Sequence, residues 1–174
     1  GRGVEAGIVS TPTNAETAKI RGVEVAFQQA LTMLPAPFDG LGVSANATFL
    51  DTEFTFLTTA GKRHTGLFQQ PATTTNESIW YQRGPIEARV SHNYIGGFLE
   101  TINDTIPNAD QYWKGRHVYD ASVSWRFGNG LTVFVEGQNL SNSGRREVTG
   151  PGRTYLQESA NYGRTYWVGL SASF

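Results

Sequence analysis

Apolar and polar residues alternate along most of this chain with a period of two. Between residues 41 and 49 the odd positions hold Leu, Val, Ala, Ala and Phe, whereas the even positions hold Gly, Ser, Asn and Thr. This period is typical of a β-strand with one apolar and one polar face, because successive side chains point to opposite faces of the sheet. The pattern predicts about eight strands, over residues 3–10, 21–31, 41–49, 78–82, 86–94, 119–127, 131–138 and 164–174.

The connections between these strands alternate in length. Residues 34–40, 83–85 and 128–130 are short and rich in Gly and Pro, and Gly128-Asn-Gly130 has the sequence of a tight hairpin turn. Longer polar stretches, which we expect to be loops, cover residues 51–75, 100–115 and 141–162. In an antiparallel sheet this alternation places the short turns at one end and the long loops at the other, as in transmembrane β-barrels.

The composition favours a barrel in a membrane over a closed soluble core. Only 17% of the 174 residues are charged, below the roughly 25% that is usual for soluble chains. The polar face is built mainly from Ser, Asn, Thr, Gly and Gln, which suits a hydrated lumen better than an outer surface in water. Residues 164–174 also have about the length, roughly 9–11 residues, that a tilted strand needs to cross the hydrocarbon layer.

Several other classes of protein find no support in the sequence. No apolar run approaches roughly 18 residues, so we expect no membrane-spanning helix. A net charge of −1 provides no basic footprint for nucleic acid, and the absence of cysteine rules out disulfides and thiolate metal sites. The start, Gly1-Arg-Gly, lacks the features of a signal peptide. We therefore expect that a leader has been removed or that the chain is the back end of a longer protein.

Five segments resemble the barrel strands of TonB-dependent outer-membrane receptors, in the order in which that family has them. They are residues 20–25 (IRGVEV), 76–94 with a turn at Gly84-Pro85, 119–124 (YDASVS), 135–142 (VEGQNLSN) and 163–174 (GRTYWVGLSASF). The segment 135–142 is the most specific of the five. Trp125 stands at a position where the family commonly has tyrosine or another aromatic residue.

The resemblance implies an all-β fold in which an antiparallel transmembrane segment of about eight strands belongs to a larger barrel, of about 22 strands. Residues 1–174 would be the carboxy-terminal portion of the receptor barrel, without its plug domain. The implied function is the active uptake of a large, scarce solute, such as an iron chelate, cobalamin or an oligosaccharide, across the outer membrane of a Gram-negative bacterium. The implied partners are outer-membrane lipid, the plug domain and remaining strands, TonB acting through the plug, and the barrel assembly machinery. No cofactor is implied.

Two further functions remain open on the sequence: a self-contained eight-stranded outer-membrane barrel acting as an anchor or adhesion protein, and a soluble lipocalin-like ligand carrier. An enzyme is the least supported reading, because no catalytic constellation and no phosphate-binding motif is present. His64, His92 and His117 lie far apart in the sequence, with no carboxylate or cysteine at ligand spacing. We expect them to be structural or solvated and not to bind a metal.

Candidate functional residues fall into three groups. Charged residues on the polar faces of the strands are expected to face the lumen, where they contact plug or ligand or pair with one another across neighbouring strands: Glu24, Glu87, Arg89, Asp120, Arg126 and Glu136. Residues in the long loops are candidates for ligand contact: Arg63, His64, Tyr112, Trp113, Arg145 and Arg146. The last strand resembles the assembly signal of bacterial outer-membrane barrels through Tyr166, Val168, Leu170 and Phe174.

Overall fold

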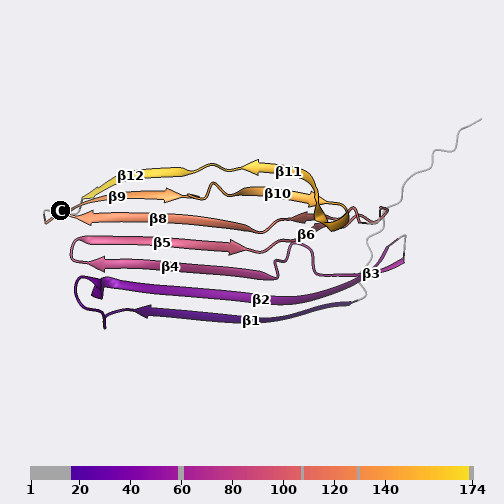
Figure 1. Ribbon diagram of the computed structural model, residues 1–174, viewed down its shortest axis with the longest axis horizontal. Coiled ribbons are helices and arrows are strands. Elements are labelled where there is room, and N and C mark those ends of the chain that lie inside the picture. The colour runs from indigo at the N-terminus through magenta and orange to yellow at the C-terminus, as the bar shows by residue number, and fades with distance from the viewer. Residues whose placement is uncertain (1–16, 59–60, 107, 129, 173–174) are drawn as a thin grey trace, which may run out of the picture.

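The computed structural model describes residues 17–58, 61–106, 108–128 and 130–172, and these form two antiparallel β-sheets (Figure 1). The strand expected at residues 3–10 and the terminal Phe174 lie outside the described residues. In the part of the chain that is described, no helix is long and apolar enough to cross a bilayer.

The large sheet contains the long strands of the molecule. Its order is β1-β2-β4-β5-β8-β9-β12, with β3 paired to the far end of β2. The bounds are β1 Thr17–Ala30, β2 Leu41–Thr58, β3 Gly61–Thr65, β4 Thr73–Arg83, β5 Ile86–Ile95, β8 Arg116–Arg126, β9 Leu131–Gln138 and β12 Thr165–Ala172. Each long strand pairs with the next along the chain, so the sheet is a simple meander. Among the described residues, β1 and β12 each have one neighbour in this order, which leaves the sheet with two open edges.

The small sheet lies beyond one end of the large sheet and has the order β11-β10-β7-β6 (Figure 1). Its strands are β6 Phe98–Thr101, β7 Gln111–Trp113, β10 Gly144–Thr149 and β11 Tyr155–Asn161, and a short 3₁₀ turn, η2 Pro151–Arg153, joins the last two. The three short turns lie together at the opposite end, where η1 Phe38–Gly40 precedes β2. We call these the long-loop end and the short-turn end. The predicted separation of short turns from long connections is confirmed for the described strands.

The register of the large sheet places its apolar residues in continuous rows on one face. Val43 lies opposite Ile79, Ile79 opposite Val90, and Val90 opposite Ala121. A second row runs from Val123 to Val135 and on to Val168. Val43 and Ala121 are half-buried, and the other side chains of these rows are exposed, from 43% for Val135 to 76% for Val168. No other part of the described chain covers this face, so its partner must be another apolar medium or surface.

The polar face of the large sheet also contains large side chains, and glycines make room for them. Trp80 lies over Gly42 on the neighbouring strand, and Phe134 lies over Gly169 in the same way, so that a Cβ at either glycine would collide with the ring. Glycine within a strand marks such a close approach. These rings therefore lie flat against the sheet.

The buried hydrophobic side chains of the described residues belong to the small sheet. Leu99 in β6 is 5% exposed and Val148 in β10 is 2% exposed, and they are the buried hydrophobic residues among those described. The two strands carry register shifts, at Leu99/Thr101 and at Glu147/Val148, that bend them locally. The hydrophobic core of the molecule thus lies at the long-loop end and not between layers of the large sheet.

The expectation that residues 51–75, 100–115 and 141–162 are loops is wrong in detail. β2 continues to Thr58 and then turns back as β3, and β4 begins at Thr73 and not at residue 78. The other two stretches contain β7, β10 and β11. Backbone pairing continues past the apolar rows of the large sheet, because β-branched residues favour strands even where no apolar face is formed. The Thr-rich sequence here supplies such residues. Periodicity of hydrophobic residues cannot detect such strands.

Candidate functional site

The six charged residues expected to face the lumen all lie on the polar face of the large sheet. Arg89, Ser122 and Glu136 follow one another across β5, β8 and β9. The same alternation places Glu24, Glu87, Asp120 and Arg126 on this face. Within the described residues none of the six forms an ion pair with another. The expected pairing of opposite charges across the strands is therefore not seen.

Other polar groups on this face do bond across strands. Ser44 Oγ lies 2.8 Å from Ser78 Oγ, and the Arg89 guanidinium donates from Nη1 to Ser78 Oγ at 3.5 Å. Asn76 Nδ2 donates to Asn46 Oδ1 at 2.8 Å. Cross-strand pairs of this kind stabilise a sheet by roughly 0.2–1 kcal/mol each. The face is thus a hydrogen-bonded polar wall that keeps several uncompensated charges.

Asn139 explains why the segment 135–142 has a distinctive sequence. Its backbone N–H donates to Asp120 Oδ1 at 2.8 Å, and its Nδ2 donates to the carbonyl oxygens of Ser143 and Gly163 at 3.0 and 2.7 Å. Its Oδ1 accepts from the Ser143 N–H at 2.8 Å. The residue has φ 51, a left-handed conformation for which Asn is enriched. Asn139 therefore fixes the chain where β9 ends and ties it to the start of β12.

An ion pair connects two of the long connections at the long-loop end. Arg63 in β3 binds the carboxylate of Asp110 with both terminal nitrogens, and the Nη1–Oδ1 distance is 3.1 Å. Arg63 also donates to the carbonyl oxygen of Asn103, whose N–H donates to Asp110 Oδ1 at 2.9 Å. Asp110 is only 4% exposed. We call this group the Arg63–Asp110 tether.

The environment of the tether favours its charged form. Burial opposes the charge on Asp110, but the hydrogen bonds from Arg63 and from Asn103 outweigh it and hold the pKa of Asp110 below its usual range. The hydrogen bond to Asp110 likewise raises the pKa of Arg63. The tether is therefore a permanent ion pair at neutral pH.

The tether borders a cavity of about 320 Å³. Arg63 and Tyr112, two of the loop candidates, line it together with Arg153 from the turn η2. The Arg153 guanidinium carbon lies 3.9 Å from the centre of the Tyr112 ring. Arg153 was not among the sequence candidates, because its place opposite Tyr112 depends on contacts between distant segments.

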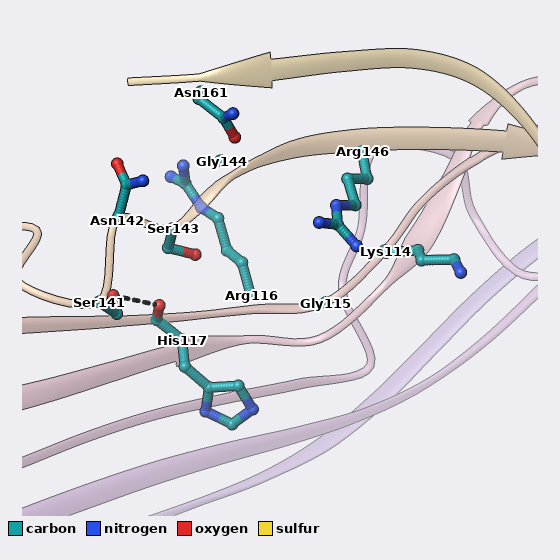
Figure 2. A pocket seen from close by; sticks show the side chains of 10 residues that line it. All are labelled: Lys114, Gly115, Arg116, His117, Ser141, Asn142, Ser143, Gly144, Arg146 and Asn161. Carbon is teal, nitrogen blue, oxygen red and sulfur yellow. Dashed lines mark hydrogen bonds between the residues drawn. The ribbon is translucent and has the colours of Figure 1, made fainter. Parts of the chain in front are cut away.

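The remaining loop candidates do not gather at this cavity. The Arg145 guanidinium carbon lies 3.0 Å from the centre of the Trp113 ring, in a cation–π contact between β10 and β7. His64 Nδ1 lies 2.9 Å from Thr55 Oγ1. Arg146 lines a different cavity, of about 330 Å³, with Lys114 and Arg116 (Figure 2). Two separate hollows thus exist at the long-loop end, and both carry arginines.

Two histidines that are separated in the sequence meet on the apolar face. Glu77 Oε2 lies 2.7 Å from His92 Nδ1, and His92 Nε2 lies 2.9 Å from His117 Nδ1. The rings of Tyr119 and Tyr94 stack on His92 and His117, each at 4.5 Å. A tight turn at Gly84-Pro85 fixes the register that places Glu77 opposite His92. The contact between Glu77 and His92 could therefore have been inferred from the sequence of this turn. No group of three or more His, Cys, Asp or Glu within the described ranges could hold a metal.

The described members of the proposed assembly signal share one face of the last strand. Tyr166, Val168 and Leu170 of β12 continue the apolar rows of the large sheet and are exposed. The fourth residue proposed for the assembly signal, Phe174, lies outside the described residues.

Long antiparallel strands, an uncovered apolar face, a polar face with charges, and a clear division between short turns and long connections define the wall of a transmembrane β-barrel. A family model described as "TonB dependent receptor-like, beta-barrel" matches residues 2–140. The chain belongs to this family, as its strand motifs indicated. The family consists of outer-membrane transporters and not of enzymes, and its barrels interact in general with a plug and with TonB. No curated protein and no solved structure matches the chain.

Proposed function

We propose that this chain forms part of the wall and the extracellular loops of an active TonB-dependent transporter in the outer membrane of a Gram-negative bacterium. The observation that carries the proposal is the uncovered apolar face of the large sheet, over which apolar side chains from β2 to β12 form rows across the strands. Lipid acyl chains are the natural cover for such a face. The long-loop end then lies outside the cell, where solute arrives.

The chain is proposed to be the carboxy-terminal portion of a larger barrel. The open edges at β1 and β12 support this, because unpaired backbone groups at a sheet edge are not tolerated in the hydrocarbon layer. In this arrangement the remaining strands pair with these edges and a plug domain fills the lumen. The alternative, a self-contained barrel, would require β1 to close on β12, and the two strands lie at opposite sides of the sheet (Figure 1).

The transported solute is proposed to be large and scarce: an iron chelate, cobalamin or an oligosaccharide. The two hollows at the long-loop end support a role for this end in contacting it, because both present arginines with aromatic or amide neighbours. The charged residues of the polar face would line the route past the plug.

Uptake in cells tests this function. Cells that carry the full receptor would be given a radiolabelled ferric chelate, cobalamin or an oligosaccharide, with and without TonB. The proposal expects one probe to accumulate only when receptor, TonB and the inner-membrane proton gradient are all present. Accumulation that is equal without TonB would indicate a passive pore and contradict it.

The mass of the protein in its native membrane tests the larger barrel. A mass several times the 19.0 kDa of this chain is expected. A mass near 19.0 kDa, with a band that shifts on heating, would instead support the self-contained barrel.

A further inference from the structure

The pairing of β8 with the strand beside it is interrupted at the long-loop end. β8 and β9 pair regularly up to Ala121 and Gly137. Beyond this point Leu140 N–H donates to the Tyr119 carbonyl oxygen and the Ser141 hydroxyl donates to the His117 carbonyl oxygen. The next backbone bond joins Lys114 to Arg146. The cavity of about 330 Å³ lies in the gap between these contacts.

Two arginine side chains enter this gap from opposite strands. Arg116 of β8 points up toward residues 142–144, and Arg146 of β10 points back toward Arg116 (Figure 2). The side-chain amide of Asn161 lies above the space between the two guanidinium groups. Lys114 lines the other side of Arg146, and its ammonium group points away from Arg116. The ring of His117 also points away from the gap.

Among the described residues that line this cavity none is Asp or Glu, so they supply it with no negative charge. Neither Arg116 nor Arg146 forms an ion pair within the described part of the chain. This contrasts with Arg63 and Arg145 nearby, which pair with Asp110 and Glu147. The guanidinium carbon of Arg116 lies 5.9 Å from the centre of the Tyr162 ring.

Hydrogen bonds within the chain fix the segment before β10. Asn139 holds residue 143 through two hydrogen bonds and residue 163 through a third. Arg164 Nε donates to the Leu140 carbonyl oxygen at 2.9 Å and closes the other side. The gap is therefore built by hydrogen bonds of the chain, and the two arginines lie at its rim, where the described residues supply no counter-ion.

We propose that this gap is an oxyanion site that takes a phosphate group, with Arg116 and Arg146 as its two clamps and Asn161 as a neutral donor. A guanidinium presents N–H groups in a planar fork that matches the oxygens of a phosphate. Two guanidinium groups from opposite strands suit a ligand with several oxygens, such as phosphate, better than they suit a single carboxylate. The phosphate can belong to a soluble solute or to a lipid headgroup of the outer leaflet, since the chemistry is shared. The site does not depend on transport.

Binding of inorganic pyrophosphate to the full receptor tests the site. The receptor would be held in nanodiscs of phosphatidylcholine and titrated by calorimetry. Arg116→Gln and Arg146→Gln are each expected to weaken binding by about tenfold, because each removes a charge-assisted hydrogen bond. The matched control is Lys114→Gln, which removes the same charge from the same cavity. It is expected to change affinity by less than about threefold, because screened charge alone contributes little at an exposed site.

Two further measurements make the test decisive. Arg116→Lys keeps the charge and loses the fork, so it is expected to weaken binding nearly as much as Arg116→Gln. A heat-shift gel verifies that each variant is folded. Pyrophosphate affinity that is unchanged in both arginine variants, or lost equally in Lys114→Gln, would overturn the proposal.

The source of the phosphate is identified in a second arm. Phosphatidic acid, which carries a phosphate monoester headgroup, would replace part of the phosphatidylcholine. Loss of pyrophosphate binding in these nanodiscs supports the site with a lipid headgroup as its occupant. Unchanged binding supports the site with a soluble phosphate as its occupant.

Discussion

The large sheet and the small sheet differ in whether their hydrophobic side chains are buried within the chain. The large sheet leaves its valines open, and its six described strand pairings along the main path run without a register shift. The small sheet buries Leu99 and Val148, and both of its strands that carry these residues are bulged. The difference indicates that the two sheets face different solvents, lipid for the large sheet and water for the small sheet. A regular sheet suffices where lipid covers the apolar face, whereas a segment in water has to build its own core.

Charge follows the same division. In the large sheet the charged residues of the polar face remain unpaired with one another, which suits a wet lumen. In the small sheet and its neighbours, Arg63 and Asp110 form a shielded pair and Arg145 and Arg153 stack on aromatic rings. The long-loop end is therefore held together by specific contacts, and it can be perturbed without disturbing the wall.

The largest effect is expected from a charge on the apolar face. Val123→Arg should destabilise the barrel by about 2–4 kcal/mol, because the guanidinium enters the hydrocarbon layer. Ser122→Arg, one residue away on the polar face, is the matched control and should cost less than about 1 kcal/mol. Unfolding of the full receptor by urea in lipid bilayers measures both. Equal destabilisation by the two substitutions would contradict the assignment of faces.

Breaking the Arg63–Asp110 tether should be nearly as destabilising, but only at the long-loop end. Arg63→Met leaves the Asp110 carboxylate shielded without its partner, and we expect the segment 98–113 to open more easily by about 3 kcal/mol. Hydrogen exchange of the backbone amides measures this opening.

A double variant sharpens the test of the tether. Combining Arg63→Met with Asp110→Leu removes the orphaned charge and should recover part of the loss. Amides of β4 and β5 should keep their protection in both variants. A loss of protection in β4 and β5 comparable to that in the small sheet would show that the two regions are not independent.

Truncation of an apolar side chain distinguishes the two burial modes. Leu99→Ala should destabilise the small sheet by about 2 kcal/mol, because Leu99 is buried in a local core that can partly relax. Leu57→Ala should have an effect within about 0.5 kcal/mol, since Leu57 is 71% exposed near the end of β2. Hydrogen exchange of β6, β7 and β10 reports the first effect. Similar values for the two substitutions would remove the case for a core at the long-loop end.

Acid provides the smallest and most selective perturbation. Because folding lowers the pKa of Asp110, the tether contributes its full stability above the ordinary aspartate pKa, about 3.9, and loses it as the pH falls below that value. Protection of residues 98–113 should therefore be constant between pH 8 and pH 5, after correction for intrinsic exchange. A decrease within that range would argue against a charged, shielded pair.

The sequence predicted the wall far better than the long-loop end. The strand at residues 131–138 and the turns at Gly84 and Gly130 could be read from alternation and glycine, because both signals are local. The face of each charged candidate followed from the same period. β7 and β10 could not be found, because strands of three and six residues are too short to carry a sustained alternation.

Long-range contacts limited the prediction of sites. Arg63 and Asp110 are brought together by two hairpins that meet beyond the wall, and nothing in either segment specifies the other. The contact of His92 with Glu77 could have been inferred from the turn at Gly84, but its contact with His117 required the pairing of β5 with β8. Pairing across a long connection depends on its folded length, which hydrophobic periodicity does not reveal.

The orientation of the large sheet is tested most directly by spin labels on adjacent residues of β5. This chain contains no cysteine, so Val90→Cys and Ser91→Cys introduce single labelling sites within it. In the full receptor in native-like membranes, we predict that a nitroxide at residue 90 collides readily with oxygen dissolved in lipid and little with a water-soluble nickel chelate. A nitroxide at residue 91 should show the reverse. Equal exposure of both labels to the nickel chelate would contradict the placement of this chain in a membrane wall.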